Sequence, residues 1–137
     1  MKKQRNEKPV ISVVMSVFNG SEYIYKTIKS VLQQNFKNIE FIIVDDASTD
    51  NTVKIIESIP DSRILLIRNK QNKGLAQNLN YAIQLSRGEY IARIDADDIC
   101  LRYRFDLQLL FMKIIKNVAI LGGGAIVTGK QIGRAHV

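Results

Sequence analysis

Three aspartates stand close together after a short apolar run in the second half of the chain. Residues 90–98 read Tyr-Ile-Ala-Arg-Ile-Asp-Ala-Asp-Asp, so Asp95, Asp97 and Asp98 are near neighbours. Carboxylates held this close repel one another and need a cation, basic side chains or open water around them. Hard oxygen donors of this kind suit Mg²⁺ or Mn²⁺ rather than zinc. The alternative is a solvated acidic turn, because Asp-x-Asp alone is a weak motif.

Alternating apolar patterns predict the elements that carry these residues. Short, β-branched runs predict strands, and they cover 10–17, 39–44, 63–68, 90–94 and 118–121. Apolar residues at helical spacing predict helices over 24–32, 53–59, 75–83 and 105–115. The alternation predicts an α/β fold with a mainly parallel sheet flanked by helices and joined by right-handed crossovers.

Polar residues follow three of the predicted strands. In open parallel sheets, ligands bind at the carboxyl ends of the strands. We therefore expect Phe18-Asn19, Asp45-Asp46 and residues 95–98 to meet at one edge, although they are far apart in sequence. Their convergence favours a metal site over a solvated turn. Basic residues around the third strand would draw in an anionic ligand there, and these are Arg63, Arg68, Lys70 and Lys73.

The length of 137 residues allows one domain with a real core. We expect a basic flexible tail over 1–9, a partial domain over 10–127 and a segment of uncertain structure over 128–137. The net charge of +7 is partly carried by the tail. We expect that tail to be solvated, and contact with anionic lipid or nucleic acid is the less favoured alternative.

Cysteine and hydropathy patterns restrict the compartment. Cys100 is the single cysteine and His136 the single histidine, so neither a disulfide framework nor a Cys/His zinc site is expected. No apolar run approaches the roughly 20 residues that span a bilayer, and the start lacks the apolar core of a signal peptide. We expect a cytoplasmic protein without a transmembrane segment, whose membrane contact would be peripheral.

Four ordered segments resemble the inverting glycosyltransferases of family 2, which have the Rossmann-like GT-A fold. They lie within the stretch from Val10 to Phe105, and they are Val13 to Gly20, Ile42 to Asp50, Asn72 to Asn80 and Gly88 to Ile99. The last segment, which contains the DXD motif, is the most similar. The resemblance implies that the chain is the nucleotide-sugar-binding portion of such an enzyme, with a UDP-sugar as donor.

The resemblance also implies roles for individual residues. The turn after the first strand would cup the base, largely through its backbone, and Asp46 would accept a hydrogen bond from uracil N3. Asp95 would contact the ribose side, and Asp97 would bind Mn²⁺ or Mg²⁺ bridging the two phosphates. That ion would neutralise charge on the diphosphate leaving group. The full set expected at the nucleotide sugar is Ser16, Val17, Phe18, Asn19, Asp46, Gly74, Asp95, Ala96 and Asp97.

Transfer with inversion also needs a general base, which deprotonates the acceptor hydroxyl. The family places this carboxylate in a later segment, so we expect it beyond Val137 and expect the chain alone to be inactive. The acceptor implied is a glycan or a lipid-linked saccharide of polysaccharide biosynthesis, read mostly by the same later segment. Two positions depart from the family pattern. Arg102 stands where relatives commonly have proline, and Leu79 where many have arginine.

Three other readings compete with a glycosyltransferase. A non-catalytic nucleotide-binding module would share the same residues and lack only the base. A receiver-like signalling domain would use Asp45-Asp46 as a phosphoacceptor pocket, but it leaves residues 95–98 unexplained. A nucleic-acid binder is suggested by the positive charge alone, without a recognition motif. The Gly122-Gly123-Gly124 run is interpreted as a bend before a strand over 125–127, since no Lys-Ser/Thr pair follows it.

Overall fold

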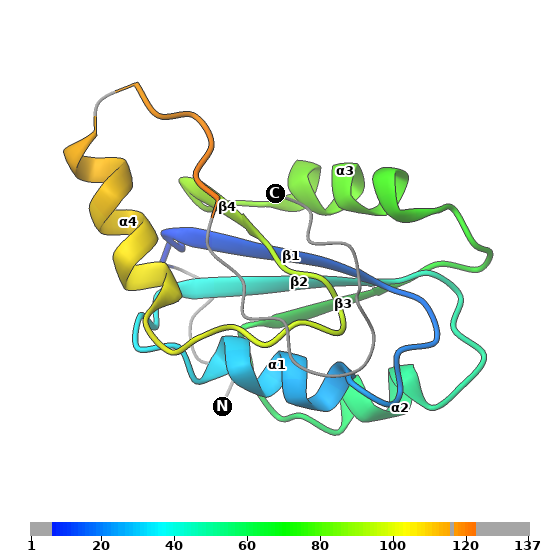
Figure 1. Cartoon of the computed structure of the whole chain (residues 1–137). Coiled ribbons are helices and arrows are strands. Elements are labelled where there is room, and N and C mark those ends of the chain that lie inside the picture. Colours follow the sequence, from blue (N-terminus) through cyan, green and yellow to red (C-terminus); the bar gives the residue numbers. More distant parts are fainter. Residues whose placement is uncertain (1–6, 116, 123–137) are drawn as a thin grey trace, which may run out of the picture.

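The computed structural model of the chain describes residues 7–115 and 117–122 (Figure 1). Its strands are β1 (Ile11–Val17), β2 (Ile39–Asp45), β3 (Ile64–Arg68) and β4 (Tyr90–Arg93). They form a four-stranded parallel sheet in the order β3-β2-β1-β4. The helices are α1 (Ile24–Leu32), α2 (Thr52–Glu57), α3 (Leu75–Leu85) and α4 (Arg104–Ile114). The predicted α/β fold with a parallel sheet is confirmed.

The helices cover the sheet from both sides. Figure 1 shows α1 and α2 on one face and α3 on the other, with α4 beside one end of the sheet. The two central strands, β1 and β2, are therefore covered on both faces. This explains why they read as nearly continuous apolar runs instead of alternating patterns.

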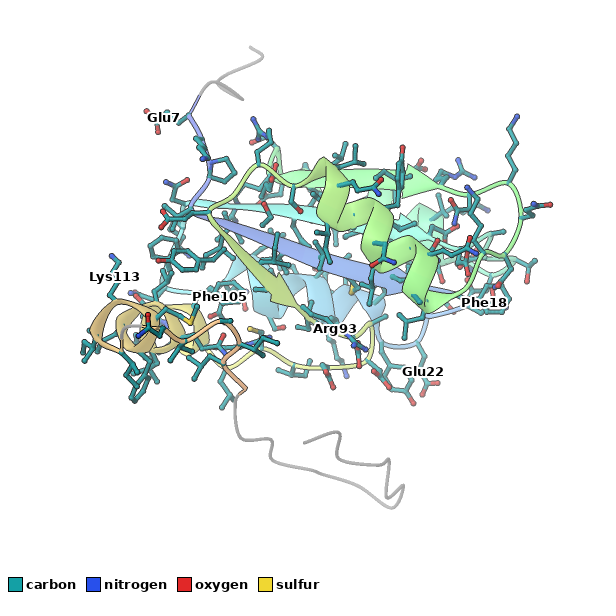
Figure 2. All side chains as sticks on the ribbon, turned by 90° about the horizontal axis from the view of Figure 1, so that it is seen from above. Glu7, Phe18, Glu22, Arg93, Phe105 and Lys113 are labelled. Carbon is teal, nitrogen blue, oxygen red and sulfur yellow. The ribbon has the colours of Figure 1, made fainter. Side chains whose placement is uncertain are left out.

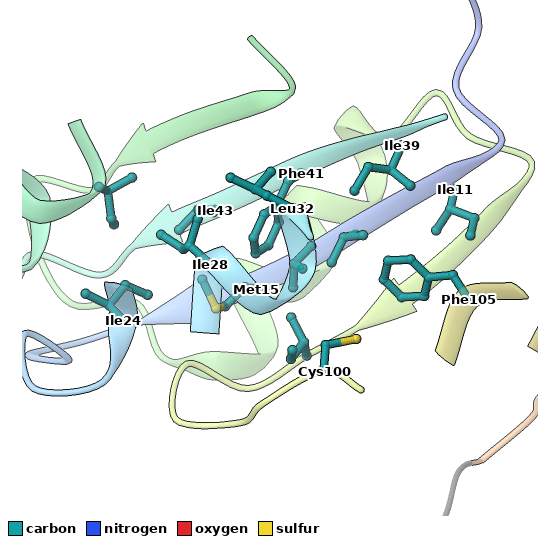
Figure 3. Packing of buried hydrophobic residues seen from close by; sticks show 14 of the residues in the cluster. Ile11, Met15, Ile24, Ile28, Leu32, Ile39, Phe41, Ile43, Cys100 and Phe105 are labelled. Atoms are coloured by element: carbon teal, nitrogen blue, oxygen red, sulfur yellow. The ribbon is translucent and has the colours of Figure 1, made fainter. Parts of the chain in front are cut away.

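The larger part of the core lies between the sheet and α1. Met15 and Phe41 point from β1 and β2 toward Ile28 of α1, and Phe105 of α4 closes one end of this cluster (Figure 3). A smaller cluster on the other face joins Val14 to the buried face of α3. Residues of opposite parity along β1 thus serve the two clusters, as the pleat of a strand requires.

The amino edge of the sheet is held by a buried carboxylate. Glu40 accepts hydrogen bonds from the Ser12 hydroxyl (2.6 Å) and from the backbone N–H and guanidinium of Arg87. Burial alone would raise the pKa of Glu40, but the hydrogen bonds from Ser12 and Arg87 and the charge of Arg87 lower it overall. Next to this cluster Gly88 approaches β1 so closely that a Cβ atom would lie 2.6 Å from the Ser12 nitrogen.

The expected fifth strand over 118–121 is wrong. Residues 118–122 are irregular, Asn117 before them has a positive φ of 72°, and Ile120 is almost fully exposed. An apolar run becomes a strand only where another strand offers hydrogen-bonding partners, and this run pairs with no described strand. The strand expected over 125–127 and the segment over 128–137 lie outside the described residues. Within the described part, none of the helices has the length and apolar character needed to cross a bilayer.

Candidate functional site

The loops that follow the strands meet at the carboxyl edge of the sheet. The parallel register sets Val17 beside Asp45 and Asp45 beside Arg68, so these strand ends are neighbours. The acidic loop after β4 joins them, because a Cβ on Gly20 would lie 4.0 Å from the Cβ of Ala96. Figure 2 shows Phe18 and Glu22 close together at one end of the molecule, far from Glu7 and Lys113. The predicted convergence of the three polar segments is confirmed.

The turn after β1 is tied to the segment that precedes α2. Asn19 adopts a positive φ of 49°, which asparagine tolerates better than most residues. Its side-chain oxygen accepts the Thr49 N–H at 2.8 Å, and its own N–H donates to the Ser48 hydroxyl at 2.9 Å. Val17 is buried, whereas Phe18 is 53% exposed. The turn is therefore rigid in its backbone while one aromatic ring remains open to a ligand.

Asp46 is 3% exposed and bonded to its own chain. One of its oxygens accepts from the Asn69 amide (2.9 Å) and the Lys73 N–H (2.8 Å), and the other accepts from the Gly74 N–H (2.9 Å). Burial raises its pKa, but hydrogen bonds from Lys73, Asn69, Asn78 and Gly74 outweigh burial and lower the pKa to about 2. Asp46 therefore holds the loop before α3 and remains ionised at neutral pH.

Two further residues of the predicted set, Gly74 and Ser16, are held by the same hydrogen-bond network. Gly74 has a φ of 86°, a conformation that favours glycine, and this geometry lets its N–H reach Asp46. The Ser16 hydroxyl accepts a hydrogen bond from the Asn78 amide at 3.0 Å, and the Asn78 oxygen accepts from Asn69 at 2.7 Å. Ser16, Asp46 and Gly74, which are far apart in sequence, are thus joined through Asn69 and Asn78.

Asp45 differs from Asp46 in what its carboxylate contacts. One oxygen accepts the Ser48 N–H at 3.1 Å. The other is buried and has no hydrogen-bonding partner among the described residues. Of the two adjacent aspartates, Asp45 is therefore the one with an unused acceptor atom at the end of β2.

The acidic loop bends directly after β4. The Asp98 N–H donates to the Asp95 carbonyl at 3.1 Å, which closes a turn around Ala96 and Asp97. Asp97 is exposed, while Asp95 is partly exposed and lies 3.0 Å from the Arg93 guanidinium. The pKa of Asp98 is raised by burial and by the neighbouring charges of Asp95 and Asp97. The loop thus concentrates negative charge beside the turn after β1.

The basic residues around β3 are only partly at this edge. Arg63 lies at the amino end of β3, where its guanidinium is 2.8 Å from Asp61. The expectation that Arg63 helps to draw in a ligand is wrong, because the residue precedes β3 and so lies at the opposite edge of the sheet. Lys70 and Lys73 belong to the loop between β3 and α3, so they do lie at the carboxyl edge.

Nearly the whole chain matches a single protein family. Residues 12–135 match the family described as Glycosyl transferase family 2. The chain belongs to glycosyltransferase family 2. A relative from Escherichia coli, the UDP-Glc:alpha-D-GlcNAc-diphosphoundecaprenol beta-1,3-glucosyltransferase WfaP, is 42% identical over 107 residues, which cover 78% of this chain and 43% of WfaP.

Solved structures of other glycosyltransferases share the fold of this family 2 chain. S. aureus TarS in complex with UDP-GlcNAc superposes with a TM-score of 0.71 and 26% identity, over 75% of this chain and 31% of TarS. The mannosyltransferase PcManGT from Pyrobaculum calidifontis, in complex with GDP-Man and Mn²⁺, gives 0.62 and 27%, over 69% and 29%. The predicted family and GT-A fold are confirmed. The chain spans less than half the length of the curated relatives that it matches.

Two polar residues at the carboxyl edge of the sheet were not predicted from the sequence. Asn69 and Asn78 join the predicted residues, and Asn78 is only 2% exposed. Asn78 stands four positions before Ala82, the other buried residue of α3, so it lies on the inward face of the helix, and that placement was the available signal. The assignment of each predicted residue to a part of the ligand stays a prediction.

Proposed function

We propose that this chain is the donor-binding part of an inverting glycosyltransferase that transfers a sugar from a UDP-sugar to a glycan or lipid-linked acceptor. The observation that carries the proposal is the meeting of the Ser16–Asp46–Gly74 network with the acidic loop at one carboxyl edge. The names of relatives support the substrates. WfaP and WfgD of Escherichia coli are named as UDP-Glc-dependent glucosyltransferases acting on a diphosphoundecaprenol-linked sugar.

We place the nucleotide base against the turn after β1. Phe18 offers an exposed aromatic ring, and the Asn78 amide orients the Ser16 hydroxyl by donating a hydrogen bond to it. Asp46 is the proposed acceptor for uracil N3, and its low pKa keeps it an acceptor at neutral pH. Cytosine has no hydrogen on N3, so the contact would select uracil.

The donor atoms of the acidic loop fit a hard divalent cation. Asp97 is an exposed carboxylate, and Asp95 precedes it in the same turn. No group of three or more His, Cys, Asp or Glu side chains suited to a metal occurs among the described residues. Mg²⁺ ordinarily takes one or two carboxylates and completes its shell with phosphate oxygens and water. We propose Asp97 as the Mn²⁺ or Mg²⁺ ligand and Asp95 as the residue facing the ribose; when bound, the ion would neutralise the diphosphate.

The same proposal includes a cytoplasmic location with peripheral contact to the membrane. Cys100, the single cysteine, is buried, and the chain has no disulfide framework of the kind that secreted domains use. The membrane contact would occur where a lipid-linked acceptor is presented. A non-catalytic nucleotide-binding module remains the second candidate, since the residues proposed here bind the donor and none is assigned as the base.

The metal assignment is tested by calorimetric titration with UDP, first in Mn²⁺ and then in EDTA. We expect the unchanged chain to bind UDP more tightly in Mn²⁺ than in EDTA. Asp97→Ala should reduce this gain in affinity by about tenfold or more, since it deletes a charged ligand. The thermal midpoint should stay nearly unchanged because Asp97 is exposed. Glu89→Ala, an exposed carboxylate that precedes β4 at the opposite edge of the sheet, is the matched control. Binding of UDP with Mn²⁺ by Asp97→Ala at the affinity of the unchanged chain would refute the assignment.

The uracil assignment is tested by comparing UDP with CDP. We expect the unchanged chain to prefer UDP by roughly tenfold, the value of one hydrogen bond to a charged acceptor. Asp46→Asn should weaken UDP binding in Mn²⁺ and in EDTA alike. Asp45→Asn is the comparison variant, because Asp45 has the unused oxygen. Equal affinities of the unchanged chain for UDP and CDP would count against uracil recognition, and loss of the preference in Asp45→Asn alone would move the role to Asp45.

A further inference from the structure

Three polar side chains on and just after α1 point into the protein. They are Thr27, Ser30 and Gln34, and their spacing of three and four residues puts them along one side of the helix. Thr27 and Gln34 are completely buried. Buried polar groups are retained only where they find hydrogen-bonding partners, so their partners define what the row does.

All three side chains bond to the backbone of the acidic loop or of the segment that continues it. The Thr27 hydroxyl donates to the Ala96 carbonyl at 2.8 Å. The Ser30 hydroxyl accepts the Cys100 N–H at 2.9 Å and donates to the Thr27 carbonyl at 2.7 Å. The Gln34 amide donates to the Leu101 carbonyl at 2.6 Å, and its oxygen accepts the Phe105 N–H at 3.3 Å. The row therefore contacts the segment from Ala96 to the start of α4.

The sheet does not hold this segment by itself. The last bond from it to β1 is donated by the Ile94 N–H to the Val14 carbonyl, at 3.2 Å. Beyond Ile94, two repelling carboxylates flank Ala96, and repulsion alone would favour a more extended loop. The hydroxyl of Thr27 fixes the peptide that joins Ala96 to Asp97, and so it influences the direction of the Asp97 side chain.

We propose that Thr27, Ser30 and Gln34 are positioning residues that hold the acidic loop in the geometry needed for a metal ion bound to a nucleoside diphosphate. This inference rests on the proposed function, because it gives the loop a ligand to be positioned for. The three residues do not contact the ligand. They act through the backbone of the loop. Because the loop is already ordered in the folded chain, little conformational entropy is lost when the ligand binds.

The test compares how strongly Mn²⁺ increases the affinity for UDP, expressed as the ratio of the Kd in EDTA to the Kd in Mn²⁺. Thr27→Val keeps the shape of the side chain and removes its hydroxyl. We expect this ratio to fall roughly three- to tenfold, the range of one hydrogen bond, while the Kd in EDTA stays nearly constant. Thr27→Ser restores the hydroxyl and should restore the ratio.

Gln34→Leu provides an independent variant at the other end of the row. It should lower the ratio in the same direction and speed hydrogen exchange of the Phe105 amide, whose N–H donates to the Gln34 oxygen. Gln33→Leu is the matched control, since Gln33 is the exposed residue beside it, and it should change neither quantity.

The outcomes separate this inference from the function on which it rests. If the unchanged chain binds no UDP in Mn²⁺, the proposed function fails and the inference fails with it. If the unchanged chain shows the Mn²⁺ effect and Thr27→Val keeps it in full, only the inference fails. A Thr27→Val chain that loses affinity equally in Mn²⁺ and in EDTA would show a merely structural role and would also overturn it.

Discussion

Both carboxylate oxygens of Asp46 accept hydrogen bonds from the chain itself, and this shapes the residue-scale behaviour of the site. A buried, bonded carboxylate with a pKa of about 2 stabilises the folded state only while it is ionised. Its partners are the Lys73 and Gly74 backbone and the Asn69 side chain, so the same charge sets the shape of the loop before α3. The structure of this loop therefore depends on one ionised group, and so would the proposed recognition of uracil.

This dependence predicts how stability changes with pH. The unfolded chain, in which the carboxyl has its ordinary pKa of 3.8, takes up the proton first as pH falls. The contribution of Asp46 is thus fully present above about pH 4 and is lost as pH falls toward 2. The loss should be about 2 kcal/mol in the free energy of unfolding.

Urea unfolding at a series of pH values measures the effect. Asp46→Asn should flatten the curve between pH 4 and pH 2 and lower stability at neutral pH, where three N–H donors lose a charged partner. The exposed Glu57→Gln serves as the control. An Asp46→Asn chain with the same pH dependence as the unchanged chain would contradict the explanation.

At the scale of elements, β4 is positioned by a close contact at its start. Gly88 lies against Ser12 of β1, where a Cβ would be 2.6 Å from a backbone nitrogen and 2.9 Å from the Ile11 carbonyl carbon. Backbone atoms of a central strand cannot move aside as the end of a flexible side chain can. The contact sets where β4 joins the sheet, and hence where the acidic loop begins.

We therefore expect Gly88→Ala to destabilise the fold by about 2 kcal/mol or more, since the added methyl group must push β4 away from β1. The measurement is the midpoint of urea unfolding. Gly122→Ala is the matched control, because a Cβ there would meet nothing within 4 Å. Equal midpoints for the two variants would mean that β4 can shift without cost.

At the scale of the whole molecule, the predicted and observed structures differ for identifiable physical reasons. The strands of the sheet and the shared edge were predictable, because buried parallel strands leave apolar runs and their ends collect polar residues. The run over 118–121 has the same pattern but pairs with no described strand. Thr27, Gln34 and Asn78 were missed because polar residues on a helix normally predict a solvent-facing side, and their burial follows only from the packed arrangement.

The hydrogen bonds of the carboxyl edge also have a kinetic consequence. Asn78 reaches Ser16 across 62 positions of sequence, and Thr27 reaches Ala96 across 69. Contacts of such long range close late, after local helices have formed, because the chain entropy of large loops must be overcome first. A nucleotide could bind this edge only in molecules that have almost finished folding. It would therefore lengthen the lifetime of the folded chain without hastening its formation.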